Sequence, residues 1–327
     1  MALSNPKDFS SSPLMVSVQE LVKGPTITIP QQYVRLDQEP LSLSFTAPSP
    51  PIPTIDMARL VSGDDDNDLE LEKLHSTCKD WGIFQLVNHG VSSSLLDKLK
   101  HEVEEFYRLP LEEKMKYKMR AGDWEGYGCR SREGGKLDWV DSLNIITNPV
   151  HRRRPHLFPE LPSSLRGDDG IQAVRLAYYP PCPKPELVMG LFPHSDITLI
   201  NILHQVNGVD GLQIKKDGLW FPLNINPDAF IVNVGDILQI FSNGVYHSIE
   251  HKVSTNAEKE RISITFSINP KNGADVGPAP SLINPDNPPL FRKVGVEQYF
   301  KDYSSRKPSG KAYLDHMRIQ NGQDNSA

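Results

Sequence analysis

The spacing of hydrophobic positions predicts a mixed N-terminal region. Apolar residues recur at helical intervals over 69–80 and again over 92–109, which predicts two helices. Between them, the largely apolar run Trp81–Val87 predicts a buried strand that ends at the turn residues which follow it. A short strand is expected at Thr54–Asp56, after a proline-rich lead. This region therefore alternates helices with strands.

Polar residues in the same region predict two further local features, a helix N-cap and a turn. Ser17 precedes a short apolar patch and predicts the N-cap of a small helix over 17–22. The acidic residues 64–66 and Asn67 predict a solvated turn, without the ligand spacing that a calcium loop requires.

In the second half of the chain the hydrophobic pattern changes from helical spacing to short strand-like runs. From Val174 onward, short β-rich runs alternate with Gly, Asn, Asp and Pro, which favours an antiparallel sandwich or jelly roll over a parallel βαβ sheet. The runs are Val174–Tyr179, Thr198–Gln205, Gly211–Ile214, Ala229–Val234, Ile237–Phe241 and Arg261–Ile268. A short helix is expected around Tyr299, before a polar end at 320–327.

Composition narrows the class of protein. A chain of 327 residues can bury a substantial core, and its net charge of −6 gives no reason to expect nucleic-acid or membrane binding. Cys78, Cys129 and Cys182 are far apart and odd in number, which favours free thiols in a reducing compartment. No signal-peptide pattern or membrane-length apolar run is present, so we expect a cytoplasmic protein.

His194-Ser195-Asp196 is a candidate metal motif. On a strand, side chains two residues apart share a face, so His194 and Asp196 would hold one ion while Ser195 faces away. Taken alone, a His-x-Asp triplet is weak evidence for a metal site, because its His and Asp side chains more often form a structural hydrogen bond. A third ligand must come from elsewhere, and the downstream candidates are His204, His247 and His251. Two histidines and one carboxylate leave one side of an Fe(II) ion open for a cosubstrate and O₂.

A second pair of polar residues points to an anion. Arg261 and Ser263 share a face of a predicted core strand, where arginine is rare unless it is paired. The planar guanidinium matches a carboxylate, and a neighbouring hydroxyl can donate to the same group. A dicarboxylic cosubstrate would supply the missing anion.

Together these motifs resemble the plant 2-oxoglutarate/Fe(II)-dependent dioxygenases, most closely the senescence-related branch that includes alkaloid O-demethylases and norcoclaurine-synthase-like proteins. The resemblance extends over most of the chain. Its further motifs are Ile52-Pro-Thr-Ile-Asp56, Trp81-Gly-Ile-Phe-Gln-Leu-Val-Asn-His-Gly90, Tyr178-Tyr-Pro-Pro-Cys-Pro183, Gly211-Leu-Gln-Ile214 and Ile249-Glu-His251.

The resemblance implies an α+β fold with a double-stranded β-helix (jelly roll) core and flanking helices. We therefore expect an N-terminal region over 1–150, a connector over 151–170, a catalytic core over 171–275 and a helical tail over 276–327. The family inserts a long helical pair before the core. In this chain the connector is too short for it, so the pair is expected to be missing or shortened.

The resemblance also assigns roles to residues. His194, Asp196 and His251 would be the iron ligands, with His247 assigned to structure. Arg261 and Ser263, assisted by Tyr179, would hold the distal carboxylate of 2-oxoglutarate. The implied cofactors are Fe(II), 2-oxoglutarate as cosubstrate, and O₂, with ascorbate in support.

Two positions depart from the family pattern. Ala177 stands where relatives carry an asparagine that organises the metal-bound end of 2-oxoglutarate, and alanine cannot donate that bond. Ser267 stands where an aromatic residue often stacks on the substrate, which predicts a roomier or more polar pocket.

The function implied is hydroxylation or O-demethylation of a small aromatic specialised metabolite, such as an alkaloid or flavonoid, with release of succinate and CO₂. The expected partner is this small molecule, and the expected state is a monomer. Alternatives are a hormone-oxidising dioxygenase, a catalytically impaired binding protein, and a zinc hydrolase using the same three ligands, which would leave Arg261 unexplained.

Overall fold

One eight-stranded sheet draws strands from both halves of the chain. The structure of the protein is a computed structural model, and it describes residues 17–24, 28–35, 51–63, 65–120, 123–129, 135–148, 171–306 and 310–319. The sheet order is β1 (Thr54–Asp56), β2 (Ile83–Val87), β10 (Phe230–Val234), β7 (Ile200–Gln205), β12 (Arg261–Asn269), β5 (Ile171–Tyr179), β4 (Asp141–Asn148) and β3 (Gly126–Tyr127). Only the β1–β2 pair of this sheet is parallel.

A smaller antiparallel sheet has four strands. Their order is β6 (Leu191–His194), β11 (His251–Val253), β8 (Leu212–Lys216) and β9 (Leu219–Pro222). Buried residues of both sheets form one hydrophobic cluster, to which β8 contributes Ile214, β10 Ile231 and β5 Tyr179. Apolar side chains of the two sheets are therefore packed together, and this region forms the central core.

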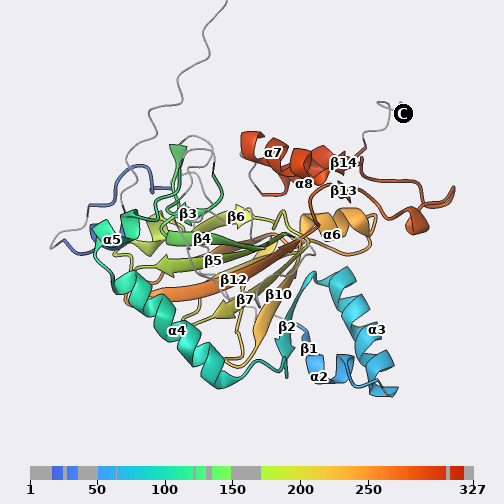
Figure 1. Cartoon of the computed structure of the whole chain (residues 1–327), viewed down its shortest axis with the longest axis horizontal. Helices are drawn as coiled ribbons and strands as arrows, with labels where there is room; N and C mark the ends of the chain where they lie inside the picture. The colour runs from blue at the N-terminus through green and yellow to red at the C-terminus, as the bar shows by residue number, and fades with distance from the viewer. Residues whose placement is uncertain are drawn as a thin grey trace, which may run out of the picture.

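Helices cover the outside of the larger sheet. In Figure 1, α4 (Ser93–Arg108) runs diagonally along β5, β12 and β7, and its Val103 and Tyr107 are buried against those strands. α3 (Asp65–Asp80) lies beside β1 and β2. The remaining elements are α1 (Val18–Leu21), α2 (Met57–Leu60), α5 (Leu111–Met115), α6 (Asp236–Phe241), α7 (Val296–Arg306), α8 (Ala312–Met317) and the small pair β13 (Asp275–Val276) and β14 (Val294–Gly295). None of the helices in the described ranges is both long and apolar enough to cross a membrane.

Most predicted elements are confirmed. Ser17 caps α1 by accepting from the Glu20 backbone N–H, and the two predicted N-terminal helices correspond to α3 and α4. The predicted helix around Tyr299 is α7. The predicted connector 151–170 and the polar end 320–327 lie outside the described residues.

Two predictions of local structure are wrong. The run Ile237–Phe241 is not a strand but most of α6, because Gly235 ends β10 and the buried Ile237 and Ile240 are spaced three apart on one helical face. The predicted acidic turn is helical from Asp65 onward. Acidic residues are favoured in the first turn of a helix by the helix dipole, so the same charges are compatible with either structure.

The turn between β10 and α6 lies directly on the chain segment that follows β6. The Gly235 N–H donates to the carbonyl oxygen of Leu199 at 3.0 Å, and the Asp236 N–H donates to that of Asp196 at 2.7 Å. A Cβ atom on Gly235 would lie 2.0 Å from the carbonyl oxygen of Thr198. Glycine is therefore required here by close approach of two backbone segments.

We predict that Gly235→Ala lowers the free energy of unfolding by about 1–3 kcal/mol, because the added methyl group must push these two segments apart. Urea unfolding of the metal-free protein measures this. Gly295→Ala is the matched control, since a Cβ at Gly295 meets nothing within 4 Å. Equal stability of the two variants would contradict this account of the turn.

Candidate metal centre

Two histidines are held opposite each other by strand pairing. His194 is the last residue of β6 and His251 the first of β11, and the antiparallel register pairs them directly. Their ring centroids are 4.4 Å apart. The side chain of His251 is 7% exposed and that of His194 14%, so both rings are largely removed from water.

Each imidazole is oriented by a backbone carbonyl. Nδ1 of His194 lies 2.8 Å from the carbonyl oxygen of Phe192, and Nδ1 of His251 lies 3.2 Å from that of Ile249. With the proton on Nδ1 donated to the carbonyl, Nε2 keeps its lone pair and faces the site. This is the usual arrangement of a metal-binding histidine, whose second nitrogen is fixed by an outer partner.

Asp196 completes the group. Its Oδ1 lies 3.6 Å from Nε2 of His194 and 3.6 Å from Nε2 of His251, and the three ligand atoms all lie within 4.8 Å of one another. Burial acts to raise the pKa of Asp196, but the two histidines and two amide side chains outweigh it, so the pKa is lowered. Asp196 is therefore a carboxylate, ready to bind a cation.

The local geometry of the motif differs from the prediction. β6 ends at His194, so Asp196 lies beyond the strand and not on it. The backbone contact with Asp236 holds Asp196 in place instead of strand pairing. Ser195 does face away, as predicted, and its hydroxyl donates to Oδ2 of Asp236 at 3.1 Å.

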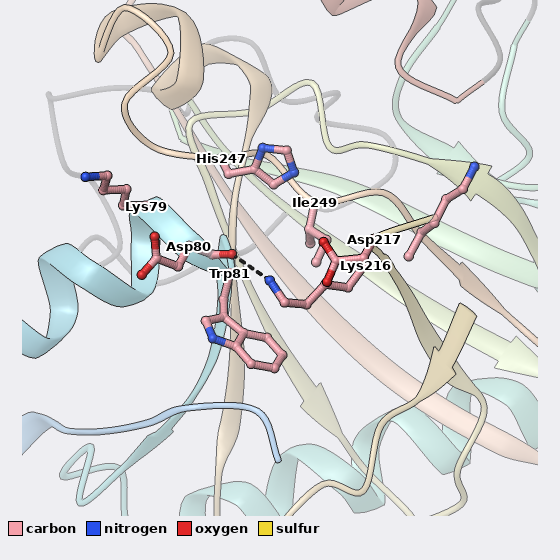
Figure 2. Close-up of a pocket in the computed structure, with 8 residues that line it drawn as sticks. Lys79, Asp80, Trp81, Lys216, Asp217, His247 and Ile249 are labelled. Carbon is pink, nitrogen blue, oxygen red and sulfur yellow. Dashed lines mark hydrogen bonds between the residues drawn. The ribbon is translucent and has the colours of Figure 1, made fainter. Parts of the chain in front are cut away.

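The other two candidate histidines are not part of the group. His247 lines a separate pocket with Lys79, Trp81 and Lys216, as Figure 2 shows. Burial, together with the charges of Lys311 and Lys216, lowers the pKa of His247 to about 4, so it is neutral at physiological pH. His204 packs edge-on against Phe230, with ring centroids 5.6 Å apart. Among the three downstream candidates, His251 is the one that lies with His194 and Asp196.

Arg261 and Ser263 are both 2% exposed on β12, as expected. The guanidinium donates to the Ser263 hydroxyl at 3.2 Å and to the Gln205 amide oxygen at 3.5 Å. Its carbon lies 5.2 Å from the ring centroid of Tyr179, which is the β5 residue paired with it. Within the described ranges, Nε has no hydrogen-bond partner, and no ion pair involves Arg261. Burial lowers the pKa of Arg261, against the opposing effects of Tyr179 and Asp210.

Small residues make space around this cation. A Cβ on Gly211 would lie 3.1 Å from Cδ of Arg261, and one on Gly190 would lie 2.9 Å from the Tyr179 ring. Ala177 is 3% exposed and is paired with Ser263 on one side and Ser142 on the other.

The other residues that drew attention are structural. Tyr127 and Trp139 are both 0% exposed and belong to hydrophobic clusters. Burial raises the pKa of the Cys182 thiol to about 11, which fits a packed cysteine and not a nucleophile. His89 accepts from the Val91 N–H and stacks on the ring of Phe230, which is a packing role. The three cysteines are free.

Two residues of the centre were missed. Asn233 and Asn201 interact with the Asp196 carboxylate from β10 and β7. The sequence does mark Asn233 as unusual, because it is the single amide in the otherwise apolar run Phe230–Val234. A polar residue in a buried strand needs a partner, and a nearby ligand carboxylate is one.

Comparison with known families identifies the class. Residues 170–270 match the 2OG-Fe(II) oxygenase superfamily, and residues 52–161 match the family described as non-haem dioxygenase in morphine synthesis N-terminal. The chain belongs to the plant 2-oxoglutarate/Fe(II)-dependent oxygenases. Its cofactor is Fe(II) and its cosubstrate 2-oxoglutarate. The two imidazoles and one carboxylate fit such an ion, since a ligand set of this kind would bind one side of it and leave the other side to cosubstrate and O₂.

Particular relatives resemble the chain over nearly its whole length. It is 43% identical to oxoglutarate-dependent flavonoid 7-O-demethylase 1 of Ocimum basilicum, covering 93% of this chain and 91% of that protein. It is 41% identical to codeine O-demethylase of Papaver somniferum, covering 93% and 96%. The crystal structure of JOX2 in complex with 2OG, Fe and JA is similar with a TM-score of 0.81 at 32% identity, covering 94% of this chain and 99% of that one.

The sequence alignments with these relatives contain more positions than the number of residues of this chain that they include. The alignment with the Ocimum protein spans 343 positions, whereas 93% of 327 residues is about 304. About 39 aligned positions therefore hold no residue of this chain. The two matched family regions, ending at 161 and beginning at 170, lie close together.

We predict that His251→Ala abolishes Fe(II) binding, because it removes one of three ligands, whereas His247→Ala largely retains it. Titration of the metal-free variants with Fe(II) under anaerobic conditions, read by equilibrium dialysis, separates the two. The reverse pattern would overturn the assignment of the third ligand.

Proposed function

We propose that the chain O-demethylates or hydroxylates a small aromatic metabolite of the flavonoid or alkaloid kind. The observation that carries this proposal is the intact group of His194, Asp196 and His251 in a chain more than 40% identical to two O-demethylases. Those two relatives are named for a flavonoid and an alkaloid, so their common feature is a methoxylated aromatic substrate.

We infer that Arg261, Ser263 and Tyr179 hold the distal carboxylate of 2-oxoglutarate. The support is a buried guanidinium with no carboxylate partner in the described ranges, which is costly unless an anion joins it. A carboxylate placed there would accept from the guanidinium and from the Ser263 hydroxyl, which already lie within hydrogen-bond distance of each other.

The two-sheet arrangement supports the finer description of the fold. We infer that the four-stranded sheet and the strands β10, β7, β12 and β5 of the larger sheet together form the double-stranded β-helix. Apolar side chains of the four-stranded sheet and of β10, β7 and β5 share one buried cluster, and the strand pairings are antiparallel. The metal ligands and Arg261 would then open into the same interior.

When bound, Fe(II) supplies the activation of O₂, one oxygen atom going to 2-oxoglutarate, which becomes succinate and CO₂, and the other to the substrate. Hydroxylation of an O-methyl carbon gives a hemiacetal, which breaks its C–O bond to release formaldehyde and a phenol. The residues of this chain supply positioning: Asp196 stays ionised, and backbone carbonyls orient both imidazoles through Nδ1 so that Nε2 faces the site. The low exposure of these groups keeps water from the site.

A second candidate is oxidation of a hormone-like acid. The specific observation in its favour is the similarity to JOX2, whose structure contains JA. The identity to that protein is lower than to the O-demethylases. A hydrolytic zinc site is not favoured, because it assigns no role to the buried Arg261.

We predict that the Fe(II)-loaded protein, given 2-oxoglutarate, O₂ and a methoxylated flavonoid or alkaloid, releases succinate and formaldehyde in equal amounts. Chromatography for succinate and a colorimetric formaldehyde assay measure the ratio. The matching phenol without its methyl group is the substrate control, and His251→Ala is the protein control. Succinate release that responds to JA but to no methoxylated aromatic would favour the second candidate and contradict the first.

A further inference from the structure

The two oxygens of the Asp196 carboxylate have different surroundings. Oδ1 faces both imidazoles, at 3.6 Å from each Nε2. Oδ2 accepts a hydrogen bond from the side-chain amide of Asn233 at 3.1 Å. One oxygen therefore points to the ion position, and the other is occupied by a protein donor.

A second amide reaches the same carboxylate. Asn201 lies directly opposite Asn233 in the β7–β10 register, and its side chain also lowers the pKa of Asp196. The Thr198 hydroxyl donates to Oδ1 of Asn201 at 3.1 Å, so the amide NH₂ of Asn201 remains available as a donor. Asn201 is 6% exposed and Asn233 4%, so water does not compete for these bonds.

Backbone contacts fix the distance between the donors and the carboxylate. The turn after Asn233 is bonded to the segment after Asp196 at three points, where the N–H groups of residues 235, 236 and 237 donate to the carbonyls of residues 199, 196 and 198. The distances are 3.0, 2.7 and 3.1 Å. Asn233 is thus held on a rigid frame that also carries its acceptor.

We propose that Asn233 and Asn201 are positioning residues that restrict Asp196 to binding the ion through Oδ1 alone. Carboxylates bind metals through one oxygen or through two, and the choice depends on what occupies the second oxygen. A carboxylate that used both oxygens would take a fourth of the six positions on an octahedral ion. Two would remain, enough for the 2-oxo acid end of 2-oxoglutarate but not for O₂ as well.

This proposal concerns the iron site and not the substrate. It would hold for any reaction that needs three open positions, so it stands apart from the choice between O-demethylation and hormone oxidation. Normal metal binding by the wild-type protein without oxidation of any methoxylated aromatic would defeat the proposed function and leave this inference untouched.

The test uses the full chain with Co(II) in place of Fe(II), because Co(II) is stable in air and its visible ligand-field bands change with coordination number. Asn233→Leu keeps the approximate volume and removes the donor. We expect its dissociation constant for Co(II) to rise 10–100-fold, as is usual for loss of an outer partner of a ligand. We also expect a changed band pattern, while the unfolding midpoint of the metal-free protein shifts little.

Asn269→Leu is the matched control, since Asn269 is a buried amide of the same sheet that bonds to the Ile171 carbonyl, not to a ligand. It should bind Co(II) with wild-type affinity and spectrum. Wild-type affinity and spectrum in Asn233→Leu, or equal losses in both variants, would overturn the proposal. If Asn233→Leu does not fold, Asn201→Ala decides: weaker binding by about tenfold supports the proposal, and unchanged binding overturns it.

Discussion

The metal centre depends on the antiparallel pairing of β6 with β11. This pairing places His194 opposite His251 and thereby fixes two imidazoles whose residues are 57 positions apart in the sequence. Neither strand is long, and the turn at Gly235 supports the segment that follows β6. The larger sheet contributes the partners of the third ligand through β7 and β10. The site is therefore a junction between the two sheets, and it requires both.

Two buried charges at this junction, one negative and one positive, are a physical reason for it to bind both a metal ion and an acidic cosubstrate. Asp196 is a carboxylate held away from water, and Arg261 is a guanidinium held away from water without a carboxylate partner in the described ranges. A buried charge is costly unless an opposite charge compensates it. A divalent cation would compensate the first charge, and under our proposal a dicarboxylate bound at one end to that cation would compensate the second. The fold thus has a physical reason to take Fe(II) and 2-oxoglutarate together.

Local sequence patterns predicted most of the long elements, although they missed the eight-residue strand β4. α3, α4, β5 and β12 follow from periodic apolar positions, and the Arg261–Ser263 pair follows from strand alternation. The pattern could not distinguish α6 from a strand, because a short apolar run fits both periods. It also gave no sign of the β6–β11 pairing, since contacts between distant segments leave no local period. The choice of His251 over His247 rested on family resemblance, and the geometry then gave its reason.

We propose above that Arg261 receives the far carboxylate of a cosubstrate whose other end lies on the metal. The most direct test compares the affinity of the Co(II)-loaded protein for 2-oxoglutarate and for 2-oxopentanoate, which lacks that carboxylate, in wild type and Arg261→Gln. The wild type should prefer 2-oxoglutarate by about a hundredfold, the usual scale for a buried charge pair, and the variant should lose this preference. A folded variant that keeps the full preference, or a wild type that shows none, would contradict the claim.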